Sequence, residues 1–342
     1  MSFDPDAPAN ADQIFGLPFT PRNARVVLIP VPWQATTSYR RGTREGPRAV
    51  LEASAQVDLH DLEVGDAWKE GFAIEPEDDR IRLWDEAAEG DALAVIAAQT
   101  GEGEGIVPED ALERVNALGE QLNDHIYREV SRLFEGGHLP GVLGGDHSVP
   151  FGAIAAAAER YPGLGILHID AHADLRVAYE GFTWSHASIF YNVLTRIPGI
   201  GAVAQVGLRD VGAREAEFAQ EEPRVFWFTD PQMQRALAEG RTWLSIVRDI
   251  VDTLPERIWI SWDIDGLDPA LCPGTGTPVP GGLTFPETCH LLEMLAKSGR
   301  RVIGFDLCEV APSTGGDEWN GSVGARILYK LLGCTLRSHR AK

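Results

Sequence analysis

The hydrophobic positions of this chain form short apolar runs separated by amphipathic stretches, a pattern typical of strands alternating with helices. Several runs are almost continuously apolar, as expected for parallel strands that are buried on both faces of a sheet. The predicted strands are Arg25–Pro30, Leu139–Leu143, Leu164–Asp170, Ala202–Val206, Arg224–Phe228, Ile258–Asp263 and Arg301–Leu307.

Helical periodicity is clearest at three places between and after these runs. In Asp110–Glu135, apolar residues recur at steps of three and four. Pro286 is placed to begin a second helix, and Ser322–Leu332 predicts a third. Alternating strands and helices predict the α/β class, with a mostly parallel sheet between two helical layers in a three-layer αβα sandwich.

One region departs from this alternation. Residues 66–110 are acidic and Gly-rich near Thr100–Gly105, which predicts an insertion on the surface. We find no internal repeat. The economical interpretation is a single domain over residues 1–342 that begins with an N-terminal arm, residues 1–23.

The charge balance restricts the partners of this chain. Thirty Lys and Arg residues against 51 Asp and Glu give a formal net charge of −21. A phosphate-rich partner would be repelled, so neither nucleic acid nor an anionic membrane surface is expected. The hydrophobic fraction of 44% excludes a disordered chain. Small cationic ligands and bound metal ions are compatible with this charge.

The ends and the cysteines indicate a cytoplasmic protein. The first residues are acidic and Pro-rich, unlike a secretory signal or a transit peptide. No apolar run approaches the roughly 18 residues of a membrane helix. Four cysteines without a Cys-x-x-Cys pair are most simply buried free thiols in a reducing compartment.

Polar motifs follow four of the predicted strands, at the sheet edge where open α/β folds bind ligands. Gly-Gly-Asp-His-Ser at 144–148 offers His147 either as a metal ligand or as a satisfied histidine of a turn. In Asp-Ala-His-Ala-Asp, alternation places Asp170, His172 and Asp174 on one face. Burying two carboxylates together is costly without a cation, so a metal explains this motif better than a solvated strand end.

The other two motifs add carboxylates. Asp263 and Asp265 share a face at the end of an apolar strand, and a hydrogen-bonded turn explains one of them more easily than both. Glu309 ends the next apolar strand, where a carboxylate that simply emerges into solvent is an equal alternative.

The combined donor set indicates two metal ions. Two histidines and four carboxylates are too many ligands for one zinc, and thiolates are absent. Two ions of the Mn²⁺ type can hold hydroxide at neutral pH. The six candidate ligands are His147, Asp170, His172, Asp174, Asp263 and Asp265.

With these motifs in this order, the sequence resembles the ureohydrolase family, which includes arginases, agmatinases and guanidinobutyrases. Ser-x-Asp-x-Asp-Gly-Leu-Asp-Pro at 261–269 and the Thr-Gly-Thr-Pro that begins at Thr275 also match. The resemblance implies an arginase-like sandwich of about eight strands. It also implies that the six candidates bind a binuclear centre of manganese, or of nickel in some members. Relatives assemble as trimers or hexamers.

The resemblance also implies roles in a metal-assisted hydrolysis. Glu309 matches the glutamate that binds the substrate guanidinium, and Asp174 is placed to hydrogen-bond the nucleophile. His186 matches a loop histidine that shuttles protons to the leaving amine, although Ala187 replaces the usual glycine. The expected products are urea, or a substituted urea, and an amine or ammonia.

The loop at 175–184 lacks the Asn and Ser pattern with which arginases hold an amino acid. Tyr179, Trp184 and Trp319 instead indicate an aromatic pocket for a compact cation, with core or subunit packing as the alternative for each. This loop and Trp33–Arg44 resemble the agmatinase-related branch that includes guanidine and biguanide hydrolases. We therefore expect guanidine, an alkylguanidine or a biguanide as substrate.

Other interpretations stay open from the sequence. Agmatine is the second substrate candidate, ahead of arginine and guanidinobutyrate. Outside catalysis, the chain would be an inactive subunit that pairs with a homologous active one, although all six ligands are present. A deacetylase of related fold would use one zinc, which the paired Asp263 and Asp265 disfavour.

Overall fold

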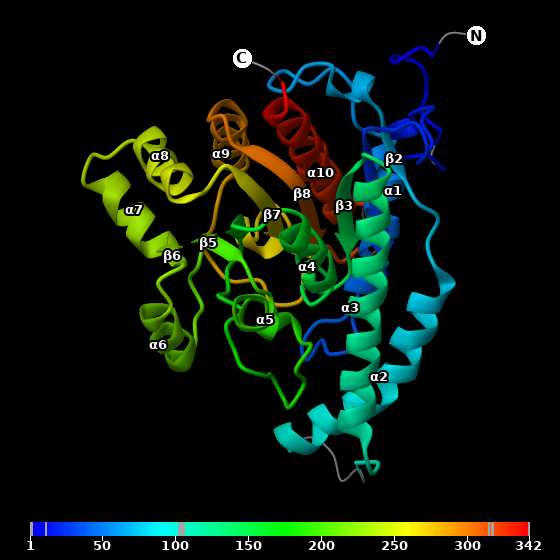
Figure 1. The fold of residues 1–342 in the computed structure, drawn as a ribbon, viewed down its shortest axis with the longest axis vertical. Helices are drawn as coiled ribbons and strands as arrows, with labels where there is room; N and C mark the ends of the chain where they lie inside the picture. The colour runs from blue at the N-terminus through cyan, green and yellow to red at the C-terminus, as the bar shows by residue number, and fades with distance from the viewer. Residues whose placement is uncertain (1–2, 11, 102–106, 314, 316–317, 341–342) are drawn as a thin grey trace.

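The computed structural model describes residues 3–10, 12–101, 107–313, 315 and 318–340. Its centre is an eight-stranded sheet in the order β2-β1-β3-β8-β7-β4-β5-β6, and every pair of neighbours is parallel (Figure 1). The strands are β1 Val26–Val31, β2 Phe72–Ile74, β3 Leu139–Gly144, β4 Leu164–Ile169, β5 Ile200–Val206, β6 Val225–Phe228, β7 Arg257–Asp263 and β8 Arg301–Cys308.

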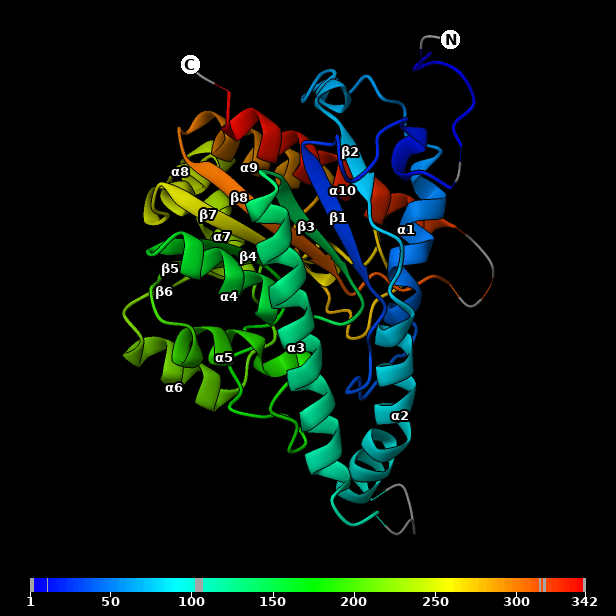
Figure 2. The same cartoon turned by 45° about the vertical axis from the view of Figure 1, so that its right-hand side comes forward.

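Helices cover both faces of the sheet (Figure 2). One face carries α1, α8, α9 and α10, and the other carries α2, α3, α4 and α5. The predicted three-layer sandwich is therefore confirmed. The helices are α1 Gly46–Ser54, α2 Asp79–Thr100, α3 Ala111–Glu135, α4 Phe151–Arg160, α5 Ile189–Arg196, α6 Ala213–Glu221, α7 Asp230–Ala238, α8 Trp243–Thr253, α9 Phe285–Lys297 and α10 Trp319–Ser338.

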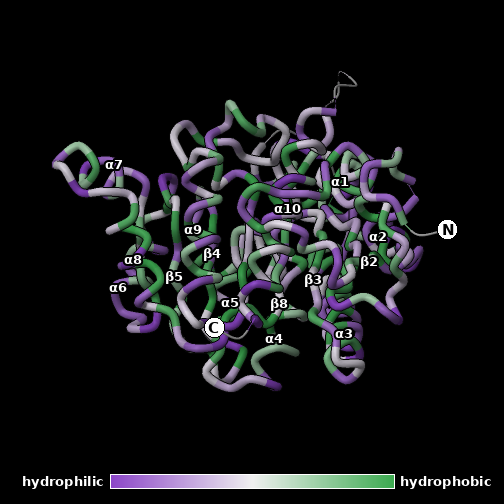
Figure 3. Tube along the Cα trace, turned by 90° about the horizontal axis from the view of Figure 1, so that it is seen from above, coloured by the Kyte–Doolittle hydropathy of each residue, from purple (hydrophilic) through white to green (hydrophobic). Residues whose placement is uncertain are grey.

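The apolar runs form strands because a central parallel strand has no solvent-facing side. All residues of β1, β3 and β4 are buried, and in Figure 3 green hydrophobic segments gather in the middle of the molecule while purple segments lie in the peripheral loops. Each of the seven predicted strands is present, with ends shifted by at most two residues. No helix within the described ranges is long and apolar enough to cross a membrane.

The region 66–110 contains two elements that the hydrophobic pattern did not predict. Phe72–Ile74 forms β2, which pairs with β1 at the edge of the sheet. The 22-residue α2 runs beside α3 (Figure 2) and buries Ile81, Ala88 and Val95. Because several residues on its buried face are small alanines, the apolar periodicity of α2 is weak, and the sequence pattern did not predict this helix. Residues 102–106 of the Gly-rich stretch lie outside the described residues.

Gly152 lets α4 approach α3 closely. A Cβ at this position would lie 2.1 Å from the Asn123 carbonyl oxygen. We expect Gly152→Ala to lower the free energy of unfolding by about 1–3 kcal/mol, as overpacking in a core does. Chemical denaturation measures this, with Gly90→Ala as the matched control. Gly90 lies in α2 with open space around it, so alanine there should stabilise the helix by about 0.5–1 kcal/mol. Equal stability of Gly152→Ala and wild type would contradict this account of the packing.

Candidate metal centre

The candidate ligands and Glu309 lie at the carboxyl ends of four neighbouring strands in the middle of the sheet. His147 follows β3, Asp170 follows β4, Asp263 ends β7 and Glu309 follows β8. Parallel strands end at the same edge, so motifs far apart in the chain converge there. The structure thus brings together all six residues that the sequence singled out as ligands.

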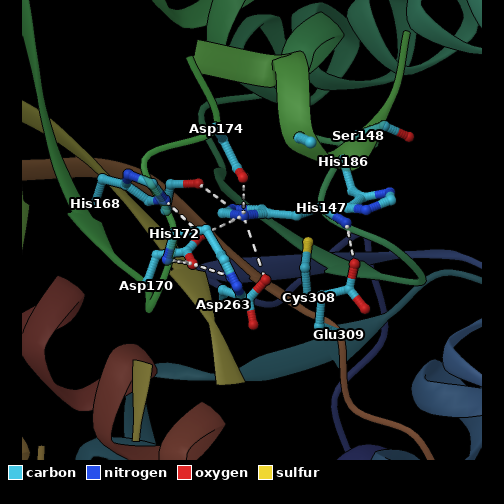
Figure 4. Close-up of polar contacts among 12 residues, drawn as sticks. His147, Ser148, His168, Asp170, His172, Asp174, His186, Asp263, Cys308 and Glu309 are labelled. Carbon is cyan, nitrogen blue, oxygen red and sulfur yellow. Dashed lines mark hydrogen bonds and ion pairs between the residues drawn. The ribbon is translucent and has the colours of Figure 1, made fainter. Parts of the chain in front are cut away.

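The imidazole of His147 is the centre of the first group (Figure 4). Its Nδ1 lies 3.0 Å from Asp170 Oδ2, 3.2 Å from Asp174 Oδ2 and 3.5 Å from Asp263 Oδ2. All four side chains are buried. Three carboxylates and one imidazole nitrogen therefore face a common volume, an arrangement suited to a hard divalent cation.

A second group is joined to the first through Asp170. The Nδ1 atom of His172 lies 3.1 Å from Asp265 Oδ2 and 3.4 Å from Asp170 Oδ1. Asp170 therefore directs one carboxylate oxygen to each histidine. The Ala171 amide donates to Asp265 Oδ1 at 3.0 Å and fixes that carboxylate. Because the two groups of side chains share only the Asp170 carboxylate, they are better suited to binding two metal ions than a single one.

The orientation of His147 is set by a hydrogen-bonded chain below it. His147 Nε2 lies 3.0 Å from Ser261 Oγ, which donates to Asp306 Oδ1 at 2.9 Å. Asp306 also accepts from Trp259 Nε1 at 2.6 Å. Because Ser261 gives its proton to Asp306, it accepts one from His147 Nε2, which leaves Nδ1 free to act as the ligand atom.

His168 supports the centre without serving as a ligand. It lies close enough to His147, Asp170 and Asp174 to be a geometric candidate. Its Nε2, however, donates to Asp170 Oδ2 at 2.8 Å, and its Nδ1 accepts from Gln205 at 2.8 Å. Both ring nitrogens are therefore engaged. Sequence analysis missed His168, Gln205 and Asp306, although a polar residue inside an apolar buried strand is a visible signal.

The electrostatics of the carboxylates favour a bound cation. Burial, together with the nearby Asp170, raises the pKa of Asp174 to about 7. Burial and the charge of Asp265 raise the pKa of Asp263 well above its usual range. Carboxylates packed this closely repel each other unless positive charge lies among them.

The pKa values of His147 and His172 are raised as well, which favours the charged form of each imidazole. Burial opposes their charge, yet hydrogen bonds to Asp170 and Asp174 raise the pKa of His147 well above its usual range. The charge of Asp265 helps to raise the pKa of His172 to about 12 despite burial. The cluster thus draws positive charge onto imidazoles, so divalent ions that displace those protons would be strongly stabilised there. The residues fit a binuclear metal centre.

Strained backbone marks two of the site residues. Asp174 and Glu309 have φ angles of 54° and 64°, in the left-handed region that side chains other than glycine rarely adopt. Each conformation costs free energy of order 1–3 kcal/mol, which the surrounding fold must offset. Such strain is typical of residues whose side chains are held in place for function.

Glu309 is buried beside the centre, and among the described residues only one of its two carboxylate oxygens has a hydrogen-bond partner. Its Oε1 accepts the His147 amide proton at 3.0 Å (Figure 4), while Oε2 has no hydrogen-bond partner among the described residues. A Cβ at Gly276 would lie 3.0 Å from Oε2, so a side chain there would crowd the carboxylate. Burial and the nearby Asp146 raise the pKa of Glu309 well above its usual range. An unpaired buried oxygen of this kind fits a cationic donor.

A cavity of about 330 Å³ opens beside the centre, and His172 and Asp174 form part of its wall. His186 and Tyr179 line it too, with their rings 5.9 Å apart and edge to face. Burial, together with positive charge on His172, lowers the pKa of His186 to about 4. The imidazole of His186 is therefore neutral at pH 7 and able to accept a proton.

Two of the expected aromatic walls lie elsewhere. Trp184 packs against Phe151, with ring centroids 4.8 Å apart, and lies under the Arg196 guanidinium. Trp319 begins α10 and donates its indole proton to the Leu271 carbonyl at 2.7 Å. Neither is among the described residues that line the cavity. Of the three aromatic residues assigned to substrate binding, the structure places only Tyr179 at the cavity.

Comparison with known proteins agrees with this geometry. The sequence model of the Arginase family matches residues 24–334. The chain is 33% identical over 321 residues to the N(1)-aminopropylagmatine ureohydrolase of Thermus thermophilus, which covers 94% of each chain. It is 31% identical over 290 residues to an agmatinase of Bacillus anthracis, which covers 84% of each.

Solved structures share the fold. The agmatine ureohydrolase of Thermoplasma volcanium aligns with a TM-score of 0.72 at 24% identity, covering 95% of this chain and 94% of that one. Proclavaminate amidinohydrolase from Streptomyces clavuligerus aligns with a TM-score of 0.70 at 24% identity, covering 96% and 97%.

The family match explains the clusters described above. Arginase-family proteins use a binuclear centre of divalent metal ions, and the buried His and Asp groups are compatible with one. The match extends over nearly the whole chain and includes all four motifs. The chain belongs to the arginase family of ureohydrolases, hydrolases that act on C–N bonds.

Proposed function

We propose that this enzyme hydrolyses a guanidino C–N bond of a compact substrate such as guanidine, an alkylguanidine or a biguanide, releasing urea or a substituted urea. The observation that carries the proposal is Oε2 of the buried Glu309, which has no hydrogen-bond partner in the part of the chain that the structure describes. A guanidinium N–H group satisfies that oxygen and neutralises the carboxylate through a charge-assisted hydrogen bond.

The candidate ligands are His147, Asp170, His172, Asp174, Asp263 and Asp265. When bound, two divalent ions, of manganese or nickel, supply a nucleophile at neutral pH and stabilise the negative charge that develops in the transition state. Glu309 holds the guanidinium with its carbon toward the centre. Asp174 accepts a hydrogen bond from the attacking water and orients it.

His186 completes the proton transfer in this proposal. Water adds its oxygen to the guanidinium carbon, and the bond from that carbon to the leaving nitrogen breaks. The neutral imidazole of His186, which lines the same cavity as Asp174, takes up the proton lost by the water and passes it to the leaving nitrogen. The products are urea, or a substituted urea, and an amine or ammonia.

The charges around the cavity support a compact substrate. Outside the candidate metal centre, the charged residues that line the cavity are two cations, Arg40 and Arg176, and two carboxylates, Asp210 and Glu215. Glu215 is already engaged, since it accepts the Leu175 amide at 2.9 Å and lies 3.6 Å from Arg176. A singly charged guanidinium that pairs with Glu309 needs no further carboxylate. A substrate with a second cationic group would have few free carboxylates to pair with in the cavity.

Agmatine is the second candidate, and one observation favours it. Asp210 is exposed on the cavity wall, where its carboxylate could pair with the distal ammonium group of agmatine. Relatives named agmatinase and aminopropylagmatine ureohydrolase point the same way.

Urea release from a substrate panel decides between these candidates. The panel contains guanidine, methylated guanidines, metformin, agmatine, guanidinobutyrate and arginine, each assayed with manganese-loaded and nickel-loaded enzyme. We expect the highest kcat/KM for a compact member. Dominant turnover of agmatine or arginine would refute our preference, and release from none of them would refute the proposed function. A trimeric or hexameric assembly stays a prediction, which sedimentation of the purified chain would test.

Tyr179 offers a test of the cavity wall. One side of its ring faces the Arg176 guanidinium at 4.9 Å, and His186 lies edge-on to it. We expect Tyr179→Ala to raise KM about three- to tenfold, the worth of a partly desolvated contact between a cation and a ring. Tyr179→Phe keeps the ring and should match wild type in steady-state kinetics. Equal KM values for all three enzymes would place the substrate away from this ring.

A further inference from the structure

The loop at residues 34–44, between β1 and α1, contributes part of the cavity wall. Ser38, Tyr39 and Arg40 line the cavity together with His186 and Tyr179, which come from a different part of the chain. Tyr39 is 70% exposed, so its own packing does little to hold the tip in place. The position of this wall must be set by contacts at the base of the loop.

Side-chain hydrogen bonds close the base of the loop. Gln34 Oε1 accepts the Gly42 amide proton at 2.7 Å. Arg41 donates to the Thr37 carbonyl at 3.2 Å. These hydrogen bonds join the two ends of the loop, with Ser38, Tyr39 and Arg40 between them.

Two carboxylates of the neighbouring helix α2 contact the residues at the two ends of this loop. Asp85 accepts from the Gln34 amide at 2.7 Å and from Arg44 at 3.2 Å. Glu89 accepts from Arg41 at 2.8 Å and lies 3.5 Å from Arg44. Asp85 and Glu89 are one helical turn apart and face the same side. Figure 2 shows the blue loop after β1 beside the cyan α2.

The burial of Asp85 distinguishes its contacts from ordinary surface ion pairs, whereas Glu89 is partly exposed. Asp85 is 1% exposed, and a buried carboxylate is costly unless its partners satisfy it. Both of its oxygens are occupied, one by loop backbone and one by a loop arginine. Loss of Asp85 would leave the Gln34 backbone amide without its partner, and loss of Glu89 would remove the ion pairs to Arg41 and Arg44, so both carboxylates help to set the geometry of the loop.

The tip of the loop at residues 34–44 places the guanidinium of Arg40 on the cavity wall. Within the described residues, Arg40 has no carboxylate within ion-pair distance. Its guanidinium lies 3.5 Å from the Pro273 carbonyl and 5.7 Å from the Tyr39 ring. An uncompensated charge there repels a second cation at the mouth.

We propose that Asp85 and Glu89 are positioning residues for substrate selection, which hold the loop so that Arg40 disfavours guanidino compounds carrying a second cationic group. This inference rests on the proposed function and deepens it. A singly charged guanidinium reaches Glu309 past the loop, whereas a substrate with an ammonium tail places that tail near Arg40.

The first test measures the loop itself. Hydrogen exchange of residues 36–42 is compared in wild type, Glu89→Gln and Asp85→Asn, each with and without metal. The matched control is Asp91→Asn, also in α2, which loses a pair with Arg114 of α3 and does not contact the loop. We expect exchange in 36–42 to rise at least threefold in both test variants and to stay at the wild-type rate in the control. Unchanged exchange in Glu89→Gln, the more exposed of the two positions, would overturn the holding role whatever the substrate is.

The second test measures selection. The ratio of kcat/KM for methylguanidine to that for agmatine should fall about two- to fivefold in Arg40→Gln, which is the range expected for one exposed charge. It should fall similarly in Glu89→Gln, with kcat for methylguanidine unchanged and metal content equal to wild type. A constant ratio would overturn the selection role. If no guanidino compound is hydrolysed, the proposed function fails with the selection role, while the exchange measurement still decides whether α2 holds the loop.

Discussion

Asp263→Asn is expected to lose metal and to lower urea release at least about 100-fold. Asp263 faces His147 Nδ1 together with Asp170 and Asp174. Asparagine keeps the shape of the side chain but removes a charge that the cation requires. Losing a residue that only orients a ligand costs 10–100-fold in metal affinity or activity, so losing a ligand should cost more.

Metal analysis and thermal unfolding test this prediction separately from activity. Wild type should bind two equivalents of metal, and its Tm should rise with metal because only the folded chain holds the site. Asp263→Asn should retain fewer equivalents and show a smaller rise. Asp268→Asn is the matched control, because Asp268 lies shortly after the end of β7 and its carboxylate accepts, among the described residues, only the Ala270 amide. Full metal occupancy in Asp263→Asn would remove this residue from the ligand set.

The centre was predictable from the sequence because its motifs are local. Asp170, His172 and Asp174 lie within five residues, and each motif directly follows an apolar run. Once the runs are parallel strands, their ends must meet at one edge. What the sequence alone could not supply was the order β3-β8-β7-β4 that makes the four ends neighbours, since strand order depends on tertiary packing.

The cavity was harder to predict because its walls come from contacts between distant segments. Trp184 and Tyr179 lie in one loop, yet only Tyr179 reaches the cavity, since Trp184 packs on Phe151 of α4. The residues that hold the opposite wall were missed for a related reason. Asp85 lies in a helix with weak apolar periodicity, and its partner Gln34 is 51 positions away.

Glu309→Gln is expected to lower kcat/KM for the preferred guanidino substrate about 10- to 100-fold without loss of metal. A hydrogen bond to a charged group contributes about 1.5–3 kcal/mol, and each 1.36 kcal/mol in the transition state is a tenfold change in rate. Glutamine is isosteric and keeps an oxygen for the His147 amide, which Glu309 Oε1 accepts at 3.0 Å. The substitution therefore removes mainly the charge that faces the substrate.

Metal content and a second variant separate this effect from damage to the centre. Glu309→Asp keeps the charge but shortens the side chain, so both variants should lose activity while both retain the wild-type metal content. Since Glu309 is outside the six-ligand set, loss of metal in Glu309→Gln would mean that the carboxylate stabilises the centre rather than the substrate. Wild-type kcat/KM in Glu309→Gln would mean that Oε2, although buried and without a partner among the described residues, does not contact the guanidinium.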